Sequence, residues 1–207
     1  MASLQDLFVS KVRAKLLQIF LSDPKEIFYV RQLVRKTDEE INAVRRELKR
    51  MEERGMVSKE ARANRLYYGF RKNYLFHEEL LRLVCKTSGL GWQIIKNKNK
   101  IGRLKFVMLS GRFARQKEHL SQNVDLLVVG EVVLPQLAAV VRGFEAKISR
   151  EINYTVMTQE EFEFRKERRD PFITSILLGS RIMLIGDEED LVSGRRKDEA
   201  KSNEGRQ

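Results

Sequence analysis

The segment from residue 37 to residue 55 constrains the fold most, because it predicts one amphipathic helix with a marked start and a marked end. Residues 37–40 read TDEE, a capping-box pattern in which a hydroxyl and a carboxylate three positions later satisfy exposed helix N–H groups. Gly55 is typical of the position that follows a helix. At 100° per residue, one side of this helix is apolar and predicts a packed face formed by Ile41, Val44, Leu48 and Met51.

The neighbouring segments complete a recognisable order of elements within the first seventy residues. An apolar-periodic helix is predicted over 9–21 and a short helix over 30–36. Residues 56–60 and 65–70 predict the two strands of a hairpin, with a turn at 61–64. Helix, short helix, capped helix and basic hairpin in this order follow the plan of a winged helix-turn-helix.

These segments also resemble a known family. The stretches YVRQLVRKT and INAVRRELKRMEERGMVSKE are similar to the core of the ArsR/MarR-type regulators of bacteria and archaea, and the resemblance covers about residues 8–70. It implies a winged helix-turn-helix that binds double-stranded DNA. It also implies a homodimer, because such proteins usually bind near-palindromic sites as dimers.

The polar side of the capped helix is the predicted DNA-reading surface, because asparagine can read adenine edges and arginine can read guanine or hold a phosphate. The predicted contacts on it are Asn42, Arg45, Arg46, Lys49 and Arg50. A solvated face is the alternative, but the i,i+4 pairs within this set are like-charged and would not support an isolated helix. The hairpin suits a phosphate backbone, with a plain exposed hairpin as the alternative. Its predicted contacts are Lys59, Arg62 and Arg65.

The formal net charge of +11 is concentrated in the first part of the chain. Residues 1–72 carry 17 Lys and Arg against 10 Asp and Glu, and residues 121–188 carry 8 against 11. This asymmetry favours a polyanion-binding face at one end, although a generally basic surface is the alternative. No apolar run reaches the ~18 residues of a membrane helix, and the start lacks a signal-peptide pattern. Together with the single cysteine, Cys85, this predicts a soluble cytoplasmic protein without a membrane partner.

The second half predicts a small α/β domain over residues 100–188. Strands are predicted over 104–109, 124–129, 152–157 and 181–185, and helices over 134–148, 159–169 and 171–178. An amphipathic helix over 74–86 and a linker, KNKNKIGR at 96–103, are predicted to join the halves, so that residues 73–99 form the connection. The polar tail, 189–207, is predicted to be disordered. The expected fold class is α+β, with a winged helix-turn-helix over 1–72 followed by this α/β domain.

A second resemblance concerns that α/β domain. Residues 107–131, VMLSGRFARQKEHLSQNVDLLVVGE, are similar to the signature of the minimal nucleotidyltransferase domain, and the resemblance covers about residues 100–187. The family signature is a strand ending in Gly-Ser, then Ala-Arg-Gly, then Ser-Asp-x-Asp on the next strand. The resemblance implies a nucleotide site at Gly111, Arg112, Arg115 and Asp125.

The chemistry that this resemblance implies is incomplete here. Arg112 stands in the serine position of the Gly-Ser turn. Asn123 and Asn153 stand where two of three acids belong, so that only Asp125 remains, and a strand-end residue that caps a neighbouring N–H is its alternative interpretation. Two magnesium ions need more anionic oxygen than one carboxylate supplies. We therefore expect no catalytic residue, metal or cofactor, and magnesium would bind only if the site is active. Arg112 and Arg115 could still hold a nucleotide or a small anion as an effector.

The sequence as a whole predicts a transcriptional regulator whose degenerate nucleotidyltransferase-like domain serves dimerisation or ligand sensing. One alternative is an active nucleotidyltransferase that modifies a nucleotide, a tRNA or a protein, which would require a complete acidic triad. The other is an antitoxin-type interaction protein, which a neighbouring toxin-like gene would favour.

Overall fold

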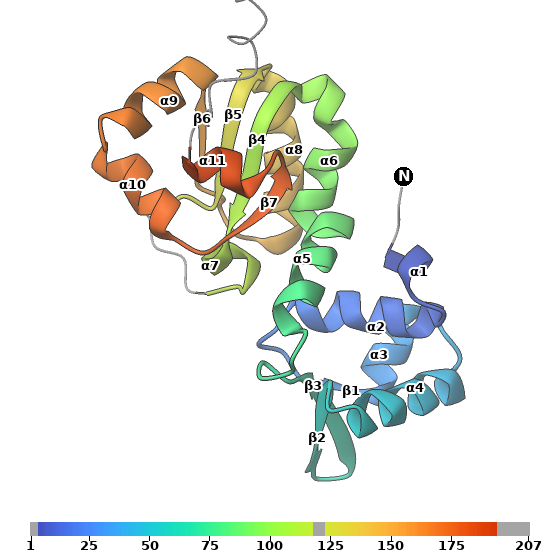
Figure 1. The fold of residues 1–207 in the computed structure, drawn as a ribbon. Helices are drawn as coiled ribbons and strands as arrows, with labels where there is room; N and C mark the ends of the chain where they lie inside the picture. The colour runs from blue at the N-terminus through green and yellow to red at the C-terminus, as the bar shows by residue number, and fades with distance from the viewer. Residues whose placement is uncertain (1–3, 118–122, 194–207) are drawn as a thin grey trace, which may run out of the picture.

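The computed structural model describes residues 4–117 and 123–193, which form a mixed α+β structure with two separate sheets (Figure 1). We call residues 4–76 the front unit and residues 89–193 the rear unit. A three-stranded sheet of order β1-β3-β2 belongs to the front unit, and a four-stranded sheet of order β6-β5-β4-β7 belongs to the rear unit. Within the described ranges, no helix is both long and apolar enough to cross a membrane.

The front unit places four helices beside its small sheet. Its elements are α1 (Leu4–Leu7), α2 (Lys11–Ser22), β1 (Phe28–Tyr29), α3 (Val30–Thr37), α4 (Ile41–Glu53), β2 (Val57–Arg62) and β3 (Arg65–Phe70). The predicted inner stripe of α4 is confirmed at Val44, Leu48 and Met51, whose side chains are fully buried. The front unit therefore has a packed helical core on which α4 rests.

The start of α4 differs from the predicted capping box. Thr37 ends α3 instead, and its hydroxyl donates to the carbonyl of Leu33 at 2.7 Å. Asp38 then adopts a left-handed conformation with φ of 53°. Glu40 is the residue that caps α4, because its carboxylate accepts the N–H groups of Asn42 and Ala43, each at 2.9 Å. Only three residues therefore separate α3 from α4.

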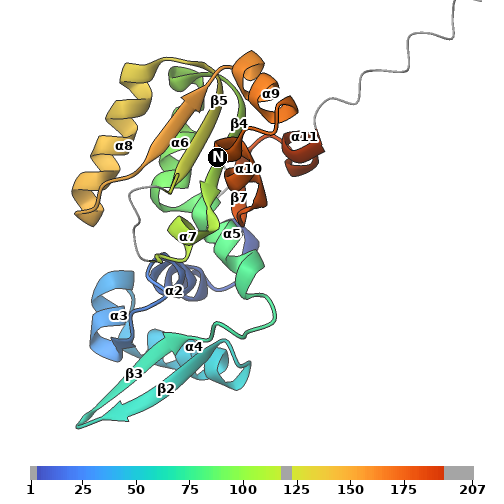
Figure 2. The ribbon, with the colours of Figure 1, turned by 90° about the vertical axis from the view of Figure 1, so that its left-hand side faces the viewer.

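The hairpin β2–β3 projects away from the rest of the molecule (Figure 2). Its strands pair from Val57↔Phe70 to Arg62↔Arg65, so the turn consists of residues 63 and 64 and is tighter than the predicted 61–64. On its other edge β3 pairs with β1, which attaches the base of the hairpin to the start of α3. The projecting tip is consequently solvent-exposed on both strands.

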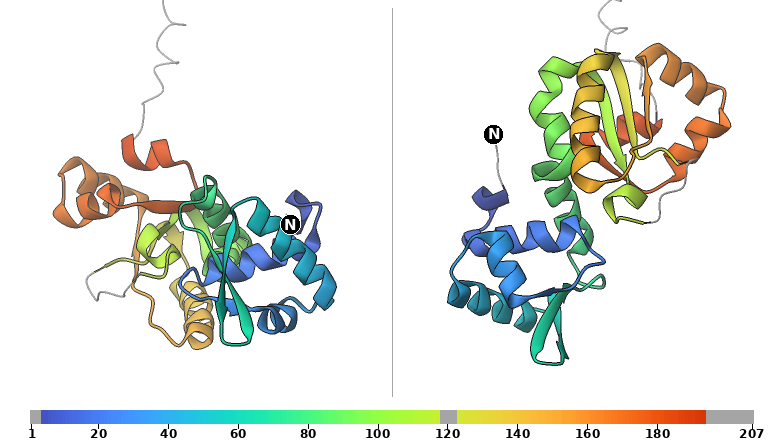
Figure 3. Two further views of the ribbon diagram at one scale, coloured as in Figure 1. Left: turned by 90° about the horizontal axis from the view of Figure 1, so that it is seen from below. Right: turned by 180° about the vertical axis from the view of Figure 1, so that it is seen from behind.

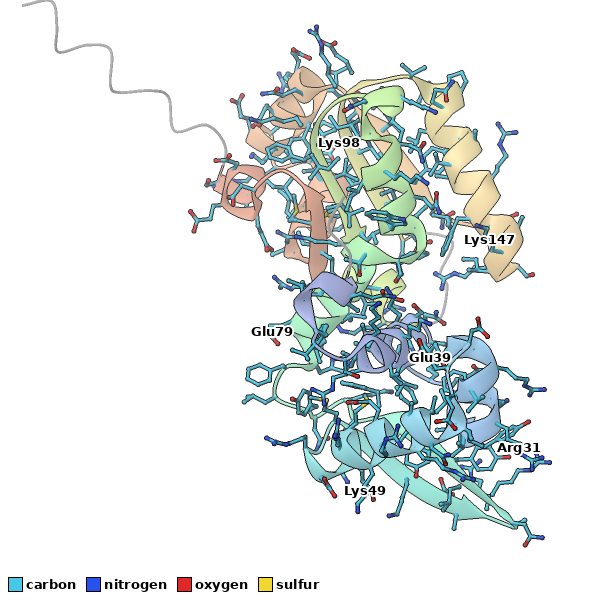
Figure 4. All side chains as sticks on the ribbon, turned by 90° about the vertical axis from the view of Figure 1, so that its right-hand side faces the viewer. Arg31, Glu39, Lys49, Glu79, Lys98 and Lys147 are labelled. Atoms are coloured by element: carbon cyan, nitrogen blue, oxygen red, sulfur yellow. The ribbon has the colours of Figure 1, made fainter. Side chains whose placement is uncertain are left out.

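The connection between the units is helical throughout. Helix α5 (His77–Thr87) confirms the predicted joining helix, and α6 (Gly89–Ile101) follows after one residue. The predicted linker at 96–103 is wrong, because its first six residues lie in α6 and its last two begin β4. The three lysines and Asn99 of that run are exposed, whereas Ile94 before it and Ile101 within it are buried, so the polar composition concealed one side of a packed helix (Lys98 is labelled in Figure 4).

The rear unit is a sheet covered on both faces. Its elements are β4 (Gly102–Ser110), α7 (Gly111–Ala114), β5 (Leu126–Val132), α8 (Leu134–Ile148), β6 (Tyr154–Met157), α9 (Gln159–Glu167), α10 (Pro171–Leu178), β7 (Arg181–Ile185) and α11 (Glu188–Ser193). The strands β5 and β6 are parallel, and β4 is antiparallel to both β5 and β7. The predicted strands and helices are confirmed with shifts of at most three residues at their ends.

Alternation along β4 and β5 builds two cores. Val107, Leu109, Leu126 and Val128 point to the face covered by α6 and α8, which lie side by side in Figure 3. The intervening side chains point to the face covered by α9, α10 and α11. Buried Leu191 of α11 belongs to this second core, so the prediction of disorder is wrong for residues 189–193; residues 194–207 lie outside the described residues. The first core continues through α5 into the front unit.

Candidate nucleic-acid interface

The outward side of α4 carries the side chains predicted to read DNA. All five lie on exposed residues, opposite the buried stripe of the helix: Asn42, Arg45, Arg46, Lys49 and Arg50. The helix follows α3 after three residues and is followed by the hairpin, so these side chains and the hairpin belong to one end of the molecule (Figures 2 and 4). The arrangement presents a basic ridge beside a projecting basic hairpin.

The cations of this ridge differ in their carboxylate neighbours. Lys49 lies 3.9 Å from the carboxylate of Glu53, and Arg50 lies 3.8 Å from that of Glu47. Within the described residues, Arg45 and Arg46 make no ion pair. The backbone N–H of Asn42 is the largest cause that lowers the pKa of the exposed Glu40 carboxyl, and Arg46 and Arg45 lower that pKa further. Arg45 and Arg46 are therefore the two α4 cations that an external anion meets without competition from a paired carboxylate.

A buried carboxylate on the inner side of α4 fixes the helix to α2. Glu47 is 4% exposed, and its carboxylate lies 2.5 Å from the Nε of Arg13 and accepts the hydroxyl of Ser10 at 3.0 Å. Sequence reasoning missed this residue because it breaks the apolar stripe. A glutamate within the inward sector of the helix was the available signal. The pair joins α4 to α2 in addition to the apolar contacts of the buried stripe.

The predicted hairpin cations are all exposed, and two of them, Lys59 and Arg62, are paired with carboxylates. Lys59 lies 2.9 Å from a carboxylate oxygen of Glu52, which raises the pKa of the lysine. Arg62 lies 2.8 Å from Glu60, and the arginine lowers the pKa of that carboxyl. Each of these cations would have to share or release its carboxylate partner on binding a phosphate.

Tyr29, on the strand that pairs with β3, contacts two arginines. The guanidinium of Arg65 lies 4.8 Å from the centre of the Tyr29 ring, and Arg35 donates to the Tyr29 hydroxyl at 3.2 Å. Arg35 is exposed on α3, together with Lys36 and with Arg31, which is labelled in Figure 4; sequence reasoning did not select these three. The signal was present in VRQLVRK, where Arg31 and Arg35 fall opposite the buried Leu33.

Glycine is required at position 111 of the rear unit by close packing. The N–H of Gly111 donates to the carbonyl of Ser180 at 2.6 Å, and a side chain there would collide with the hydroxyl of Ser180. The neighbouring Ser110 caps α7 by accepting the N–H of Phe113. The glycine at position 111 is therefore explained by its close packing against Ser180, next to β7. Arg112, next in the chain, is exposed.

Arg115 of the rear unit has a structural partner on the connecting helix α5. Its guanidinium binds both carboxylate oxygens of Glu78 on α5, at 3.2 and 2.5 Å, and this contact is the largest cause of the lowered pKa of Glu78. The same guanidinium donates to the carbonyl of Gly111 and to the hydroxyl of Ser180. The anion-binding role predicted for Arg115 would require this set of contacts to open.

The carboxylate of Asp125 is turned inward. Asp125 is 3% exposed, accepts the backbone N–H of Asn153 at 3.2 Å and lies 3.4 Å from Arg150. Its interpretation as a strand-end residue that caps a neighbouring N–H agrees with this geometry. A cation beside it and an amide at 153 do not fit a two-magnesium centre. Within the described residues, no three His, Cys, Asp or Glu side chains gather into a metal-binding group.

Comparison of the chain with protein-family models, with curated proteins and with solved structures finds no match. The two family resemblances of the sequence consequently stay predictions, and the functional argument rests on the geometry of the described residues.

Proposed function

We propose that the chain is a DNA-binding transcriptional regulator whose front unit acts as a winged helix-turn-helix. The observation that carries the proposal is the exposed ridge of α4, where Arg45 and Arg46 face solvent without a carboxylate partner among the described residues. A helix with one packed side and one such polar side suits insertion into the major groove. The projecting hairpin β2–β3 suits the role of a wing along the phosphate backbone.

The α4 ridge and the wing have different roles in this proposal. Asn42 and Arg46, near the start of α4, reach base edges, because recognition helices contact bases mainly with their N-terminal residues. Arg62 and Arg65 of the wing hold phosphates and add affinity without sequence preference. We further propose that the protein acts in the cytoplasm as a homodimer that binds two half-sites, as the resemblance to ArsR/MarR-type regulators implies.

We infer for the rear unit a nucleotidyltransferase-like fold that transfers no nucleotide. The inference is supported by the inward-turned Asp125 and by the amides at 123 and 153, which leave too little negative charge for two magnesium ions. Incubation of the full chain with labelled nucleoside triphosphates, magnesium or manganese and candidate acceptors should give no incorporation. Incorporation that disappears in Asp125→Ala would instead establish an active enzyme.

The test of DNA binding is its salt dependence. The affinity of the full chain for duplexes chosen by in vitro selection should fall linearly on a plot of log K against log salt. Each neutralised phosphate contributes a slope of roughly −0.9, so contacts from α4 and the wing together should give a slope of about −3 or steeper. Binding that is absent, or that does not change between low and physiological salt, would contradict the proposal.

A further inference from the structure

The two helical layers that cover the rear sheet carry opposite charge. Helices α6 and α8, which lie side by side on one face of the sheet (Figure 3), contain five cations and one acid. Helices α9, α10 and α11, on the other face, contain seven acids and two cations. The rear unit therefore has one basic and one acidic side. The mildly acidic total of residues 121–188 conceals this separation, because it adds α8 to the acidic helices and leaves out α6.

The cations of the basic side have no carboxylate partner. All five are exposed, and none of them forms an ion pair within residues 4–117 and 123–193. We call these five residues the α6–α8 surface: Lys96, Lys98, Lys100, Arg142 and Lys147. The acid of the same layer, Glu145, accepts the backbone N–H of Ile152 at 2.8 Å. The charge of the surface is therefore left for an external anion.

The two cations of the acidic side differ in this respect. Arg165 lies 2.8 Å from the carboxylate of Glu161, and Lys166 lies 3.4 Å from that of Glu163. Because both are paired within α9, the contrast between the two layers is larger than the residue counts alone indicate.

The lysines of α6 have a local reason to bind an anion. Ile94 and Ile101 are buried, so Lys96 and Lys100, one turn apart, lie on the side of the helix away from the sheet. Like charges at this spacing destabilise a helix, and a bound anion relieves the repulsion. From residue 96 to residue 100, α6 consists only of lysine and asparagine, whose side chains donate to phosphate oxygens.

The sequence around α6 carries the same signal. The stretch from Leu80 to Lys117 contains ten Lys and Arg and no Asp or Glu. Cations in such a stretch lack acidic neighbours along the chain, and a surface of one sign attracts a polyanion at long range.

This surface is separate from the α4 ridge. Figure 4 shows Lys98 of α6 and Lys49 of α4 at opposite ends of the molecule. Phosphates that contact α6 are consequently not those that contact α4 and the wing.

We propose that the α6–α8 surface is a second DNA-binding surface, which holds backbone phosphates without sequence preference. The choice of duplex DNA as the polyanion rests on the proposed function, because α4 and the wing bring DNA to the molecule. The acidic side of a second copy is also complementary in charge. That contact would be heterologous, and it would extend into a filament unless its rotation closed a ring.

The main test compares two matched pairs of substitutions in the full chain. Lys96→Gln/Lys100→Gln removes two charges from the α6–α8 surface, and Arg168→Gln/Arg169→Gln removes two exposed charges that follow α9. Both pairs change the net charge equally. For a random-sequence duplex, the first pair should reduce the slope of log K against log salt by about 2, and the second by less than about 0.5. All four residues are exposed, so the Tm of both variants should match that of the wild type.

Two outcomes of this comparison would overturn the inference. A wild-type slope in Lys96→Gln/Lys100→Gln would show that α6 contacts no phosphate. An equal loss in both pairs would show that only the net charge of the protein acts.

A third variant separates this inference from the proposed function. Arg45→Ala/Arg46→Ala should weaken binding to selected duplexes more than to random ones, whereas Lys96→Gln/Lys100→Gln should weaken both by the same factor. DNA binding that survives the α4 substitutions unchanged but is lost in the α6 pair would overturn the proposed function and support the second surface. The reverse result would overturn the second surface alone.

The length of the duplex shows which DNA the surface holds. If it holds flanking DNA, extending a selected site by about 30 base pairs, or about 100 Å, on each side should raise the affinity of the wild type but not of Lys96→Gln/Lys100→Gln. If it holds a second duplex, the wild type should retain a labelled duplex on an immobilised one, and the variant should not. Either result supports the inference, and the absence of both would contradict it.

Sedimentation without DNA tests the alternative partner. Self-association that weakens with salt and disappears in Lys96→Gln/Lys100→Gln would assign the α6–α8 surface to a second copy of the chain and overturn its assignment to DNA.

Discussion

The arginines of α4 and the arginines of the rear unit differ in what faces them. Arg45 and Arg46 are exposed and make no ion pair within the described residues, whereas Arg115 binds Glu78 and Arg150 lies beside buried Asp125. One residue type therefore serves two purposes in this chain. Where a carboxylate is close and partly buried, arginine joins elements together; where none is near, its charge is left for an external anion.

The largest expected effect tests the rear side of this comparison. Asp125→Ala leaves a buried N–H at Asn153 and the guanidinium of Arg150 without their carboxylate, and should lower the free energy of unfolding by about 2–3 kcal/mol. Asp125→Asn, which can still accept the N–H, should cost less. Chemical denaturation measures both. Equal stability of the wild type and Asp125→Ala would show that the carboxylate is not structural.

The next effect tests the front side. Arg46→Ala should weaken binding to a selected duplex by about 1–3 kcal/mol and relax sequence preference at one base position. Its stability should not change, because its side chain makes no ion pair that the structure describes. Competition binding against selected and random duplexes measures the effect. Arg115→Ala is the matched control and should leave DNA affinity unaltered; a reversed pattern would exchange the roles of the two arginines.

The pair between Glu78 of α5 and Arg115, the residue that follows α7, should have a smaller effect that depends on pH. Arg115 holds the pKa of Glu78 below its ordinary value of 4.5, so the pair stabilises the fold at neutral pH. That contribution is lost as the pH falls below about 4.5 through the lowered pKa. Because Glu78 is half exposed, Glu78→Gln should cost at most about 1 kcal/mol at pH 7. The difference in Tm between wild type and variant should vanish in acid, and a constant difference would contradict the assigned cause.

The smallest effects are expected in the wing. Glu60 is paired with Arg62, so Glu60→Gln should raise DNA affinity by no more than about fivefold. Arg62→Ala should lower DNA affinity by the same factor for selected and for random duplexes. Filter binding at two salt concentrations measures both changes. If Arg62→Ala impaired selected duplexes alone, the wing would read bases rather than hold phosphates.

Local patterns were sufficient for much of the fold. The strand Arg181–Ile185 and the helices Leu134–Ile148 and Pro171–Leu178 have the predicted bounds, because apolar periodicity and a proline at the first helical turn act within one element. The exposure of the predicted α4 side chains followed from the same periodicity. The predicted capping box at 37–40 was wrong, because Thr37 is the last residue of α3. Its hydroxyl donates to a carbonyl of α3 and does not cap α4.

Contacts between distant residues were decided by the tertiary structure alone. Glu47 meets Arg13 across 34 positions and Arg115 meets Glu78 across 37, and no local pattern marks such partners. The predicted linker is helical because Ile94 and Ile101 are buried against the rear sheet. The composition of the segment cannot reveal this packing. The sequence by itself determined which segments form elements and which sides are apolar. Only the packing of those elements decided which charges are paired and which are left for a ligand, because these depend on neighbours that chain order does not supply.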